Sequence, residues 1–278
     1  MADVRVNAEA PQSPAHVEIR REDYRPPDWL VPEIALKFTL GIEKTRVQSK
    51  LIVQRNPKSE ASAALRLNGD DLKPAGIWID GASSDSWRME GGDLLIDLPG
   101  NRHEIGIETE ISPAANTKLM GLYASNGMLC TQCEAEGFRR ITFFPDRPDV
   151  LSKYRVRMEG DKGQFPILLT NGNCVASGEG EGGAHWAEWE DPFPKPCYLF
   201  AMVAANLDVL EDHFRTRSGK DALLQIYVEP GKLDQAGFAM HALKKSMRWD
   251  EEVFGLELDL ERFMIVAVSD FNAGAMEN

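Results

Sequence analysis

The sequence is poor in cysteine and histidine and has no long apolar run. Its four cysteines are too few for a disulfide scaffold in a chain of 278 residues, so we expect a reducing, cytoplasmic environment. The longest apolar stretches, such as residues 263–268, are no longer than a strand, whereas a membrane-spanning helix needs about 20 residues. The N-terminus begins Met1-Ala2-Asp3 and lacks the apolar core of a signal peptide. We therefore expect no membrane segment and no export signal.

Positive charge is also in short supply. The chain has 31 Lys and Arg against 44 Asp and Glu, which gives a net charge of -13. A nucleic acid or an anionic membrane surface would require a basic face, so we expect neither as a partner. The hydrophobic share of 43% and the charged share of 27% are ordinary for a globular protein and exclude collagen-like, coiled-coil and disordered chains. The length suits about two domains.

Residues 1–206 have the pattern of an all-β domain. Short β-rich segments are separated by Gly, Pro and Asn, which indicates a sandwich or a large open antiparallel sheet. Two segments run into Asn-Gly pairs, Asn68-Gly69 and Asn171-Gly172, which favour hairpin turns. The expected strands are residues 34–40, 50–54, 65–67, 77–79, 94–98, 104–111, 154–158 and 165–170.

Residues 207–278 have a different pattern, that of a mixed α/β unit. A strand at 223–228 is followed by apolar residues at alternating steps of three and four, and then by a strand at 262–268. This spacing predicts one apolar helix face, formed by Leu233, Ala236, Met240, Leu243 and Met247. About 70 residues are too few to complete such a unit. We expect an incomplete second domain, with exposed apolar surface, local mobility or self-association.

Two segments carry groups suited to chemistry. The first, Cys130-Thr131-Gln132-Cys133-Glu134-Ala135-Glu136-Gly137-Phe138-Arg139, packs two carboxylates, an amide, two thiols and an arginine into ten residues. The second, Phe271-Asn272-Ala273-Gly274-Ala275-Met276-Glu277-Asn278, carries one carboxylate, and its Gly274 and Ala275 would let another backbone approach and pair as an added strand. Neither segment identifies a function by itself.

Together the two segments resemble the zinc aminopeptidase N family of gluzincin metallopeptidases, and its bacterial alanyl aminopeptidase branch most. Residues 274–278 match the family's GAMEN exopeptidase motif, and residues 131–138 look like its N-terminal anchor segment, followed by a similar run at 145–150. The resemblance covers the whole chain in order. It implies a mainly β fold: a large antiparallel, saddle-like β-sandwich over 1–206, then the truncated start of a thermolysin-like α/β catalytic domain over 207–278.

The resemblance also implies a role for each motif residue. Glu134 and Glu277 would bind the free α-ammonium group of a peptide, because two neighbouring carboxylates repel each other until a cation lies between them. Gln132 would lie beside the first side-chain pocket and form a hydrogen bond near the amine of the peptide. The backbone of Gly274 and Ala275 would hold the peptide as an edge strand. The remaining motif positions, of which Ala273 would leave a roomy first pocket, are Ala273, Met276 and Asn278.

Hydrolysis in that family requires zinc, bound by an HExxH helix and a further glutamate, and the 278 residues contain no HExxH. The run most similar to it is His103-Glu104-Ile105-Gly106-Ile107, in which Ile stands at the position of the second histidine. Its apolar residues alternate as in a strand, so it could not present two ligands on one helix face. We therefore expect the zinc ligands and catalytic residues downstream of Asn278, and expect no metal and no catalytic residue in this chain. The remaining domains of the parent protein would be its partners.

For several of these residues a purely structural role is an alternative to the functional one. Glu134 and Glu136 could be loop carboxylates paired with Arg139 or Arg140. Cys130 and Cys133 have the spacing of one half of a zinc site, but Cys174 and Cys197, which would have to supply the other half, are not a close pair, which favours buried structural thiols. The five histidines are scattered, and His185 reads as part of a strand or its edge.

We expect the N-terminal part of a zinc aminopeptidase that removes N-terminal residues from peptides, with this chain alone inactive. An aminopeptidase/epoxide hydrolase of the same family is the nearer alternative, against which Ala275 and Glu134 count. The more distant alternative is a non-catalytic β-sandwich that serves as a peptide-binding or assembly module.

Overall fold

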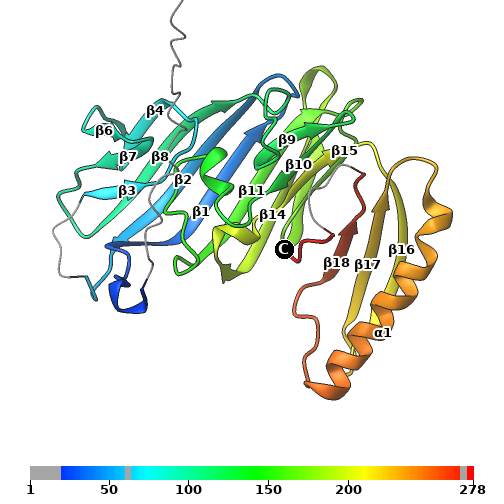
Figure 1. The fold of residues 1–278 in the computed structure, drawn as a ribbon. Coiled ribbons are helices and arrows are strands. Elements are labelled where there is room, and N and C mark those ends of the chain that lie inside the picture. The colour runs from blue at the N-terminus through cyan, green and yellow to red at the C-terminus, as the bar shows by residue number, and fades with distance from the viewer. Residues whose placement is uncertain (1–19, 60–63, 270–273) are drawn as a thin grey trace, which may run out of the picture.

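The computed structural model describes residues 20–59, 64–269 and 274–278, and it is built mainly from strands (Figure 1). The mainly β prediction is confirmed. Four sheets account for the strands in the described ranges. Five short 3-10 helices connect them, namely η1 (Arg21–Asp23), η2 (Phe138–Arg140), η3 (Glu181–Gly183), η4 (Cys197–Leu199) and η5 (Leu233–Gln235).

The largest sheet has eight strands, and each of its long strands alternates buried and exposed residues, as a sheet with one covered face must. All its pairs are antiparallel except β1 with β11. That parallel pair is a difference from the expected antiparallel sheet. It is possible because a connection of more than 100 residues, which contains one of the smaller sheets and part of another, joins the two strands. In spatial order the strands are β13 (Asn173–Glu179), β14 (Ala184–Lys195), β11 (Ser152–Asp161), β1 (Trp29–Thr39), β2 (Thr45–Arg55), β8 (Arg102–Ile111), β4 (Pro74–Ile79) and β5 (Ala82–Ser83).

Two smaller antiparallel sheets belong to the same β-domain. Side chains of all three sheets meet in one hydrophobic core, which includes Phe38, Leu51, Leu94 and Leu129. Burial of this core is the main driving force for the domain. The four-stranded sheet contains β12 (Ile167–Thr170), β15 (Met202–Ala205), β10 (Met128–Gln132) and β9 (Gly121–Ser125), and the three-stranded sheet contains β3 (Leu65–Leu67), β7 (Asp93–Ile96) and β6 (Trp87–Glu90).

The two Asn-Gly pairs singled out in the sequence do not form hairpins. Asn68 follows β3, but β3 pairs with β7, and Asn68 itself bridges to Phe144. Asn171 and Gly172 connect β12 to β13, which lie in different sheets. A tight turn needs two neighbouring strands that pair with each other, and here burial in the core gives each strand a different partner. The hairpin prediction is therefore wrong at both positions.

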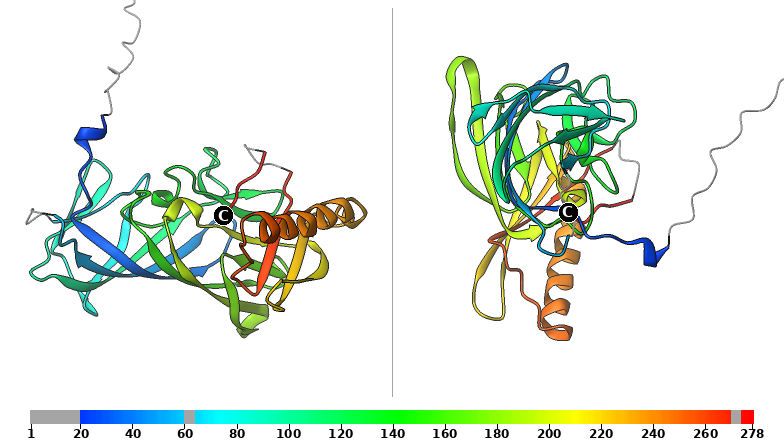
Figure 2. Two further views of the ribbon diagram at one scale, coloured as in Figure 1. Left: turned by 90° about the horizontal axis from the view of Figure 1, so that it is seen from below. Right: turned by 90° about the vertical axis from the view of Figure 1, so that its left-hand side faces the viewer.

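The chain after Leu207 forms a fourth, separate sheet covered by one long helix. Strands β16 (Asp208–Arg215), β17 (Asp221–Val228) and β18 (Arg262–Val266) pair in that order, antiparallel and then parallel. Helix α1 (Gly237–Val253) connects the two parallel strands, which confirms the predicted strand–helix–strand pattern. Figures 1 and 2 show α1 lying along one face of this sheet. This fourth sheet starts where the second domain was expected, and the division of the chain into two domains stays a prediction.

The helix itself begins and ends later than the apolar spacing predicts. Leu233 lies in η5 and is 40% exposed, because a 3-10 turn with three residues per turn breaks the helical phase. Ala236, Met240 and Met247 are buried against β16 and β17, as expected. The helix ends just before Gly255, which has a φ of 69° and so suits the left-handed position after a helix.

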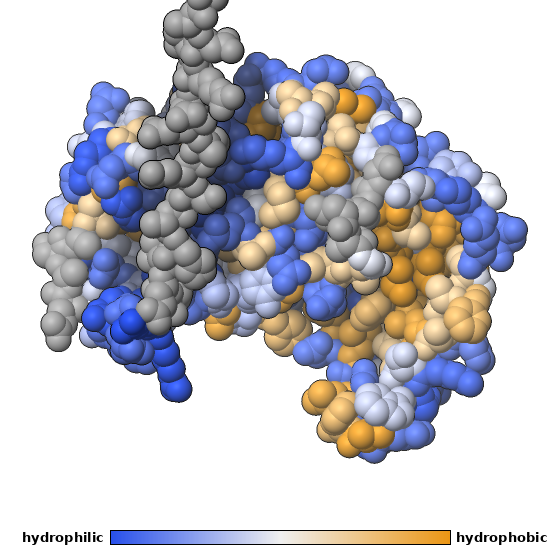
Figure 3. Space-filling model, viewed as in Figure 1, coloured by the Kyte–Doolittle hydropathy of each residue, from blue (hydrophilic) through white to orange (hydrophobic). Residues whose placement is uncertain are grey.

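Apolar side chains are exposed around α1, as predicted for this region. Phe238 is 82% exposed, and further apolar side chains lie at the far end of the helix and beyond it. Over β16–β18 and α1, Figure 3 shows apolar residues gathered on one side of the molecule. The predicted mobility and self-association stay predictions. The exposed apolar residues of this part are Leu233, Phe238, Trp249, Val253, Phe254, Leu256 and Phe263.

No helix in the described part of the chain is long and apolar enough to cross a membrane.

Gly172→Ala is expected to lower the free energy of unfolding by about 3 kcal/mol, because the new Cβ would lie 2.3 Å from the carbonyl oxygen of Glu190 at a φ of 88°. Gly182→Ala is the matched control. Its φ is also positive, at 65°, but no atom of the described residues lies within 4 Å of the place that its Cβ would take, so only about 1 kcal/mol should be lost. Urea titrations measure both values, and equal losses would contradict the role assigned to the close packing at Gly172.

Candidate functional site

The anchor segment, residues 130–139, follows a tight hairpin of the four-stranded sheet. Strands β9 and β10 pair from Ser125 and Met128, so the two residues between them, Asn126 and Gly127, form the turn, and both have positive φ. This is the conformation that an Asn-Gly hairpin prefers. Asn126-Gly127 is therefore a third Asn-Gly pair in the sequence, missed by the hairpin prediction above. Its hairpin positions the start of the anchor segment.

A tight turn at residues 134–137 reverses the chain after β10. The backbone N–H of Gly137 donates to the carbonyl oxygen of Cys133 at 2.8 Å, and the peptide bond between Glu134 and Ala135 is cis. Gly137 has to be glycine, because a Cβ there would lie 2.4 Å from the carbonyl oxygen of Gln132. The turn thus brings the residues after Glu134 back against the end of β10.

Gln132 and Glu134 lie next to each other but in different environments. The Gln132 side chain is buried, and its Nε2 donates to the carbonyl oxygen of Glu134 at 3.4 Å. Its Oε1 is buried and has no hydrogen-bond donor among the described residues. Glu134 is exposed and has no ion pair among the residues that the structure describes. An unsatisfied buried acceptor, two residues before an exposed carboxylate, is an arrangement that a ligand carrying N–H donors would satisfy.

Glu136, in contrast, is a structural carboxylate. It lies 3.2 Å from Arg139, so the competing reading of a loop carboxylate paired with arginine is confirmed for Glu136. For Glu134 that reading is not supported within the described ranges, since neither Arg139 nor Arg140 pairs with it.

A buried carboxylate fixes the end of the anchor segment. The side chain of Asp146 is 1% exposed, and its Oδ2 accepts from the backbone N–H of Arg139 at 3.1 Å and from Arg139 Nε at 3.0 Å. Its Oδ1 accepts from the thiol of Cys197 at 3.0 Å, and its backbone N–H donates to Asn68 at 3.1 Å. These contacts hold η2 and η4 together behind the anchor segment.

The cysteines are structural. All four cysteines are free thiols, and Cys130, Cys133 and Cys197 are buried. Burial, and to a smaller extent the nearby charge of Asp146, raises the pKa of Cys133 well above its usual value. A raised pKa lowers the thiolate fraction and hence reactivity. No group of three His, Cys, Asp or Glu residues in the described ranges could hold a metal ion. The reading of buried structural thiols is confirmed for these three, while Cys174 is only half-buried.

The histidine interpretations are also confirmed. His103 and Glu104 lie in β8, so the HExxH-like run is a strand, and the Nδ1 of His103 lies 2.7 Å from Asp80. His185 lies in β14 with its Nε2 2.6 Å from the carbonyl oxygen of Phe165. Both side chains have structural partners.

The end of the chain returns to the β-domain (Figures 1 and 2). The Nδ2 of Asn278 donates to the carbonyl oxygen of Leu199 at 3.2 Å, at the end of η4. Three residues further on, the backbone N–H of Met202 donates to the hydroxyl of Thr131 at 2.8 Å. Thr131 directly precedes Gln132, so one short segment contacts both motifs.

The other residues of the second motif lie apart from regular structure. Gly274, Ala275, Glu277 and Asn278 are exposed, Met276 is half-buried, and none is in a strand. Ala273 lies outside the described residues. The assignment of substrate-binding roles to these residues stays a prediction.

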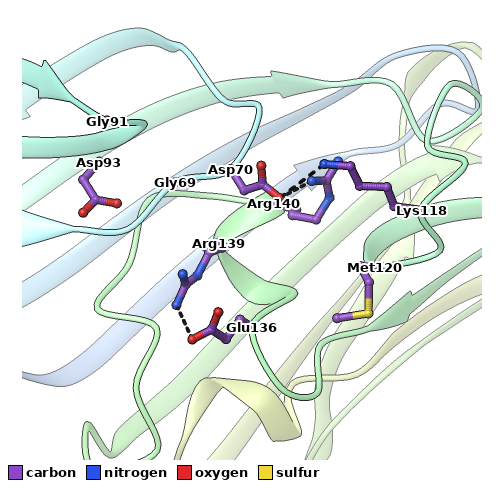
Figure 4. Close-up of a pocket in the computed structure, with 9 residues that line it drawn as sticks. All are labelled: Gly69, Asp70, Gly91, Asp93, Lys118, Met120, Glu136, Arg139 and Arg140. Carbon is purple, nitrogen blue, oxygen red and sulfur yellow. Dashed lines mark hydrogen bonds and ion pairs between the residues drawn. The ribbon is translucent and has the colours of Figure 1, made fainter. Parts of the chain in front are cut away.

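A cavity of about 400 Å³ lies next to the anchor segment, and its charges are already compensated (Figure 4). Glu136 faces Arg139, and Arg140 pairs with Asp70. The other charged lining residues pair in the same way, Lys118 with Asp70 and Asp71 at 3.7 and 3.2 Å, and Asp93 with Arg66 at 2.9 Å. The charged groups of this cavity therefore already have partners within the fold, and it is not the candidate site.

Comparison with known families decides the affiliation. The model of the peptidase M1 N-terminal domain matches residues 32–199. The chain belongs to this family. The match covers the β-domain with the anchor segment, and it confirms the resemblance drawn from the sequence.

Similar proteins are bacterial aminopeptidases. Aminopeptidase N of Escherichia coli (strain K12) is 54% identical over 258 residues, which cover 93% of this chain and 29% of that protein. Aminopeptidase N of Caulobacter vibrioides is 52% identical, over 92% of this chain and 30% of that protein. A crystal structure of Legionella pneumophila aminopeptidase A in complex with aspartic acid has a TM-score of 0.86 at 31% identity, over 91% of this chain and 30% of that one. The chain spans about 30% of the length of these M1 relatives.

Asp146→Asn is expected to lower the free energy of unfolding by about 3 kcal/mol, because it removes the charge on which the buried Arg139 and Cys197 contacts depend. Glu136→Gln, which removes the exposed partner of the same arginine, should cost less than about 1 kcal/mol. Chemical denaturation of both variants measures the difference. Similar losses would mean that Asp146 does not hold this region together.

Proposed function

We propose that this chain forms the N-terminal part of a zinc-dependent aminopeptidase and supplies the site that binds the free amine of the peptide substrate. Two findings support the enzyme class: the M1 family match and the identity of 48–54% to proteins named aminopeptidase N. The coverage of about 30% of these relatives supports the assignment to one part of a longer protein.

The observation that carries the proposal is the unsatisfied, buried Oε1 of Gln132, whose Nε2 donates to the backbone carbonyl oxygen of Glu134. A buried acceptor without a donor costs about 1–3 kcal/mol. An ammonium group offers three N–H donors and a positive charge. One such group, placed between the two side chains, would satisfy the amide oxygen and neutralise the carboxylate. A protonated peptide N-terminus has this chemistry.

Glu277 would be the second carboxylate of the amine site. The contact of its neighbour Asn278 with Leu199 supports this role, because Leu199 belongs to the segment that also contacts β10. Two carboxylates around one ammonium select against a blocked N-terminus, which would leave both without a partner. Both glutamates are exposed here, so each ion pair in this chain alone is worth only about 0–1 kcal/mol.

The described residues do not fit a zinc site. No cluster of His, Cys, Asp and Glu in the described ranges could hold a metal ion. The zinc that we propose for the full-length enzyme therefore needs ligands other than these, and its role as the activator of water is assigned to no residue of this chain. The residues of this chain bind and orient the peptide N-terminus.

We also propose a reducing, cytoplasmic setting for the protein. The support for it is chemical: all four cysteines are free thiols. Structural disulfides are rare in reducing compartments, so a chain that uses buried thiols for packing suits such a compartment.

The amine site is tested by calorimetric titration of the chain with alanyl-alanine and with its N-acetylated form. We expect about tenfold tighter binding of the free amine, from two exposed ion pairs and one hydrogen bond. Glu134→Gln should reduce this preference, whereas the control Glu136→Gln, in the same segment but paired with Arg139, should keep it. Equal binding of both dipeptides by the unmodified chain would favour the peptide-binding module instead.

The purified 278-residue chain is expected not to hydrolyse peptides, with or without added zinc, because it contains no HExxH and no described metal cluster. Release of alanine from alanyl-alanine, followed by chromatography, measures this. Turnover that a zinc chelator abolishes would overturn the assignment of the catalytic residues to other parts of the protein.

A further inference from the structure

The outer face of the eight-stranded sheet carries a groove of about 480 Å³. The strand register defines its floor, a row of residues that runs straight across five neighbouring strands. Buried residues such as Leu51 and Ile105 alternate with this row and face the core. The groove therefore lies on the opposite face of the sheet from the core. Its row is Trp78 on β4, Gly106 on β8, Lys50 on β2, Ala35 on β1 and Arg155 on β11.

Small residues keep the floor open, and an aromatic ring forms one end. Gly106 and Ala35 have little or no side chain to fill the groove. The indole of Trp78 lies over Gly76, where a Cβ would come within 2.6 Å of a ring carbon, so only glycine allows this ring position. Trp78 remains 36% exposed. This end of the groove offers an apolar surface to a ligand.

The other end offers two guanidinium groups that share one carboxylate. Arg155 donates to Glu188 in a close ion pair, and Arg157 reaches the second oxygen of Glu188 at only 3.7 Å. The guanidinium carbon of Arg157 lies 3.8 Å from the centre of the Trp186 ring, which holds the group in place. Two fixed guanidinium groups with one partner between them retain donors for a second carboxylate.

The groove is locally positive on an acidic protein. The Nζ of Lys50 lies 3.6 Å from Glu104, and the Nζ of Lys37 lies 3.8 Å from Glu159, so both ion pairs are long. Glu108, beside the groove, is already bonded to Arg46 and Gln48. The charged lining residues are four cations, Lys37, Lys50, Arg155 and Arg157, and two carboxylates, Glu104 and Glu188, whereas the whole chain has a net charge of -13.

We propose that this groove binds a short acidic segment of extended polypeptide from another protein. Carboxylates of the segment bond to Arg155 and Arg157, and an apolar side chain packs on Trp78. Guanidinium groups match carboxylates in geometry and can bind them through two parallel hydrogen bonds. Long polyanions are repelled by the rest of the surface, while a short ligand feels mainly the charges within about 10 Å. Five strands span about 20 Å, which suits about six extended residues.

The site is separate from the amine site. The anchor segment follows β10, whose buried residues face the shared core, whereas the groove lies on the far side of the sheet. A test with an N-acetylated ligand, which has no free amine, therefore does not depend on the proposed aminopeptidase function.

The experiment measures binding of an N-acetylated, fluorescein-labelled hexapeptide of alternating glutamate and leucine to the 278-residue chain, by fluorescence anisotropy at low salt. Arg157→Gln should weaken binding about tenfold. Lys153→Gln is the matched control, because it removes one charge from the same strand and face outside the groove lining, and it should have little effect.

Glu188→Gln should tighten binding several-fold, since it removes the carboxylate that competes for both arginines. A gain in affinity cannot arise from a folding defect. The proposal is overturned if the unmodified chain does not bind the peptide below about 1 mM, or if Arg157→Gln and Lys153→Gln have equal effects. Equally tight binding of a sulfated hexasaccharide would point to a glycan instead and would also overturn it.

Discussion

The buried carboxylate of Asp146 is the constraint on which the candidate site depends. A charge removed from water must be fully hydrogen-bonded, or it costs several kcal/mol. Asp146 meets this requirement through Arg139 and Cys197, while its backbone bonds to Asn68. These three residues come from distant parts of the sequence. Satisfying one charge thus fixes where the anchor segment ends and where η4 begins.

The position of η4 in turn places the second motif. Leu199, its last residue, accepts the hydrogen bond from Asn278. The next strand, β15, pairs with β10, which carries Gln132. The segment that contains η4 and β15 therefore contacts both motifs. The surrounding core supplies the stability that allows Gln132 to keep an unsatisfied acceptor.

The large sheet separates two kinds of chemistry. Its inner face contributes Phe38, Leu51 and Tyr154 to the core that supports the anchor segment. Its outer face carries charged residues in cross-strand register with glycine and alanine. Because side chains alternate along a strand, one sequence can serve both faces independently. The fourth sheet, β16–β18, also uses both faces: Tyr227 faces the main core, while Leu224 and Ile226 pack with α1.

The sequence by itself determined the element types, the β-rich character and the two motifs, because alternation, helical spacing and motif identity are local properties. Only the tertiary structure decided which strands pair. Of three Asn-Gly pairs, only Asn126-Gly127 forms a hairpin, since the strands beside the other two find partners elsewhere in the core. Glu251 shows the same limit. This residue of α1 is only 2% exposed, and its carboxylate accepts hydrogen bonds from the backbone N–H of Arg217 and from the side chain of Arg248. Its burial and its contact with Arg217 come from the packing of segments that are distant in the sequence. No pattern within the helix encodes them.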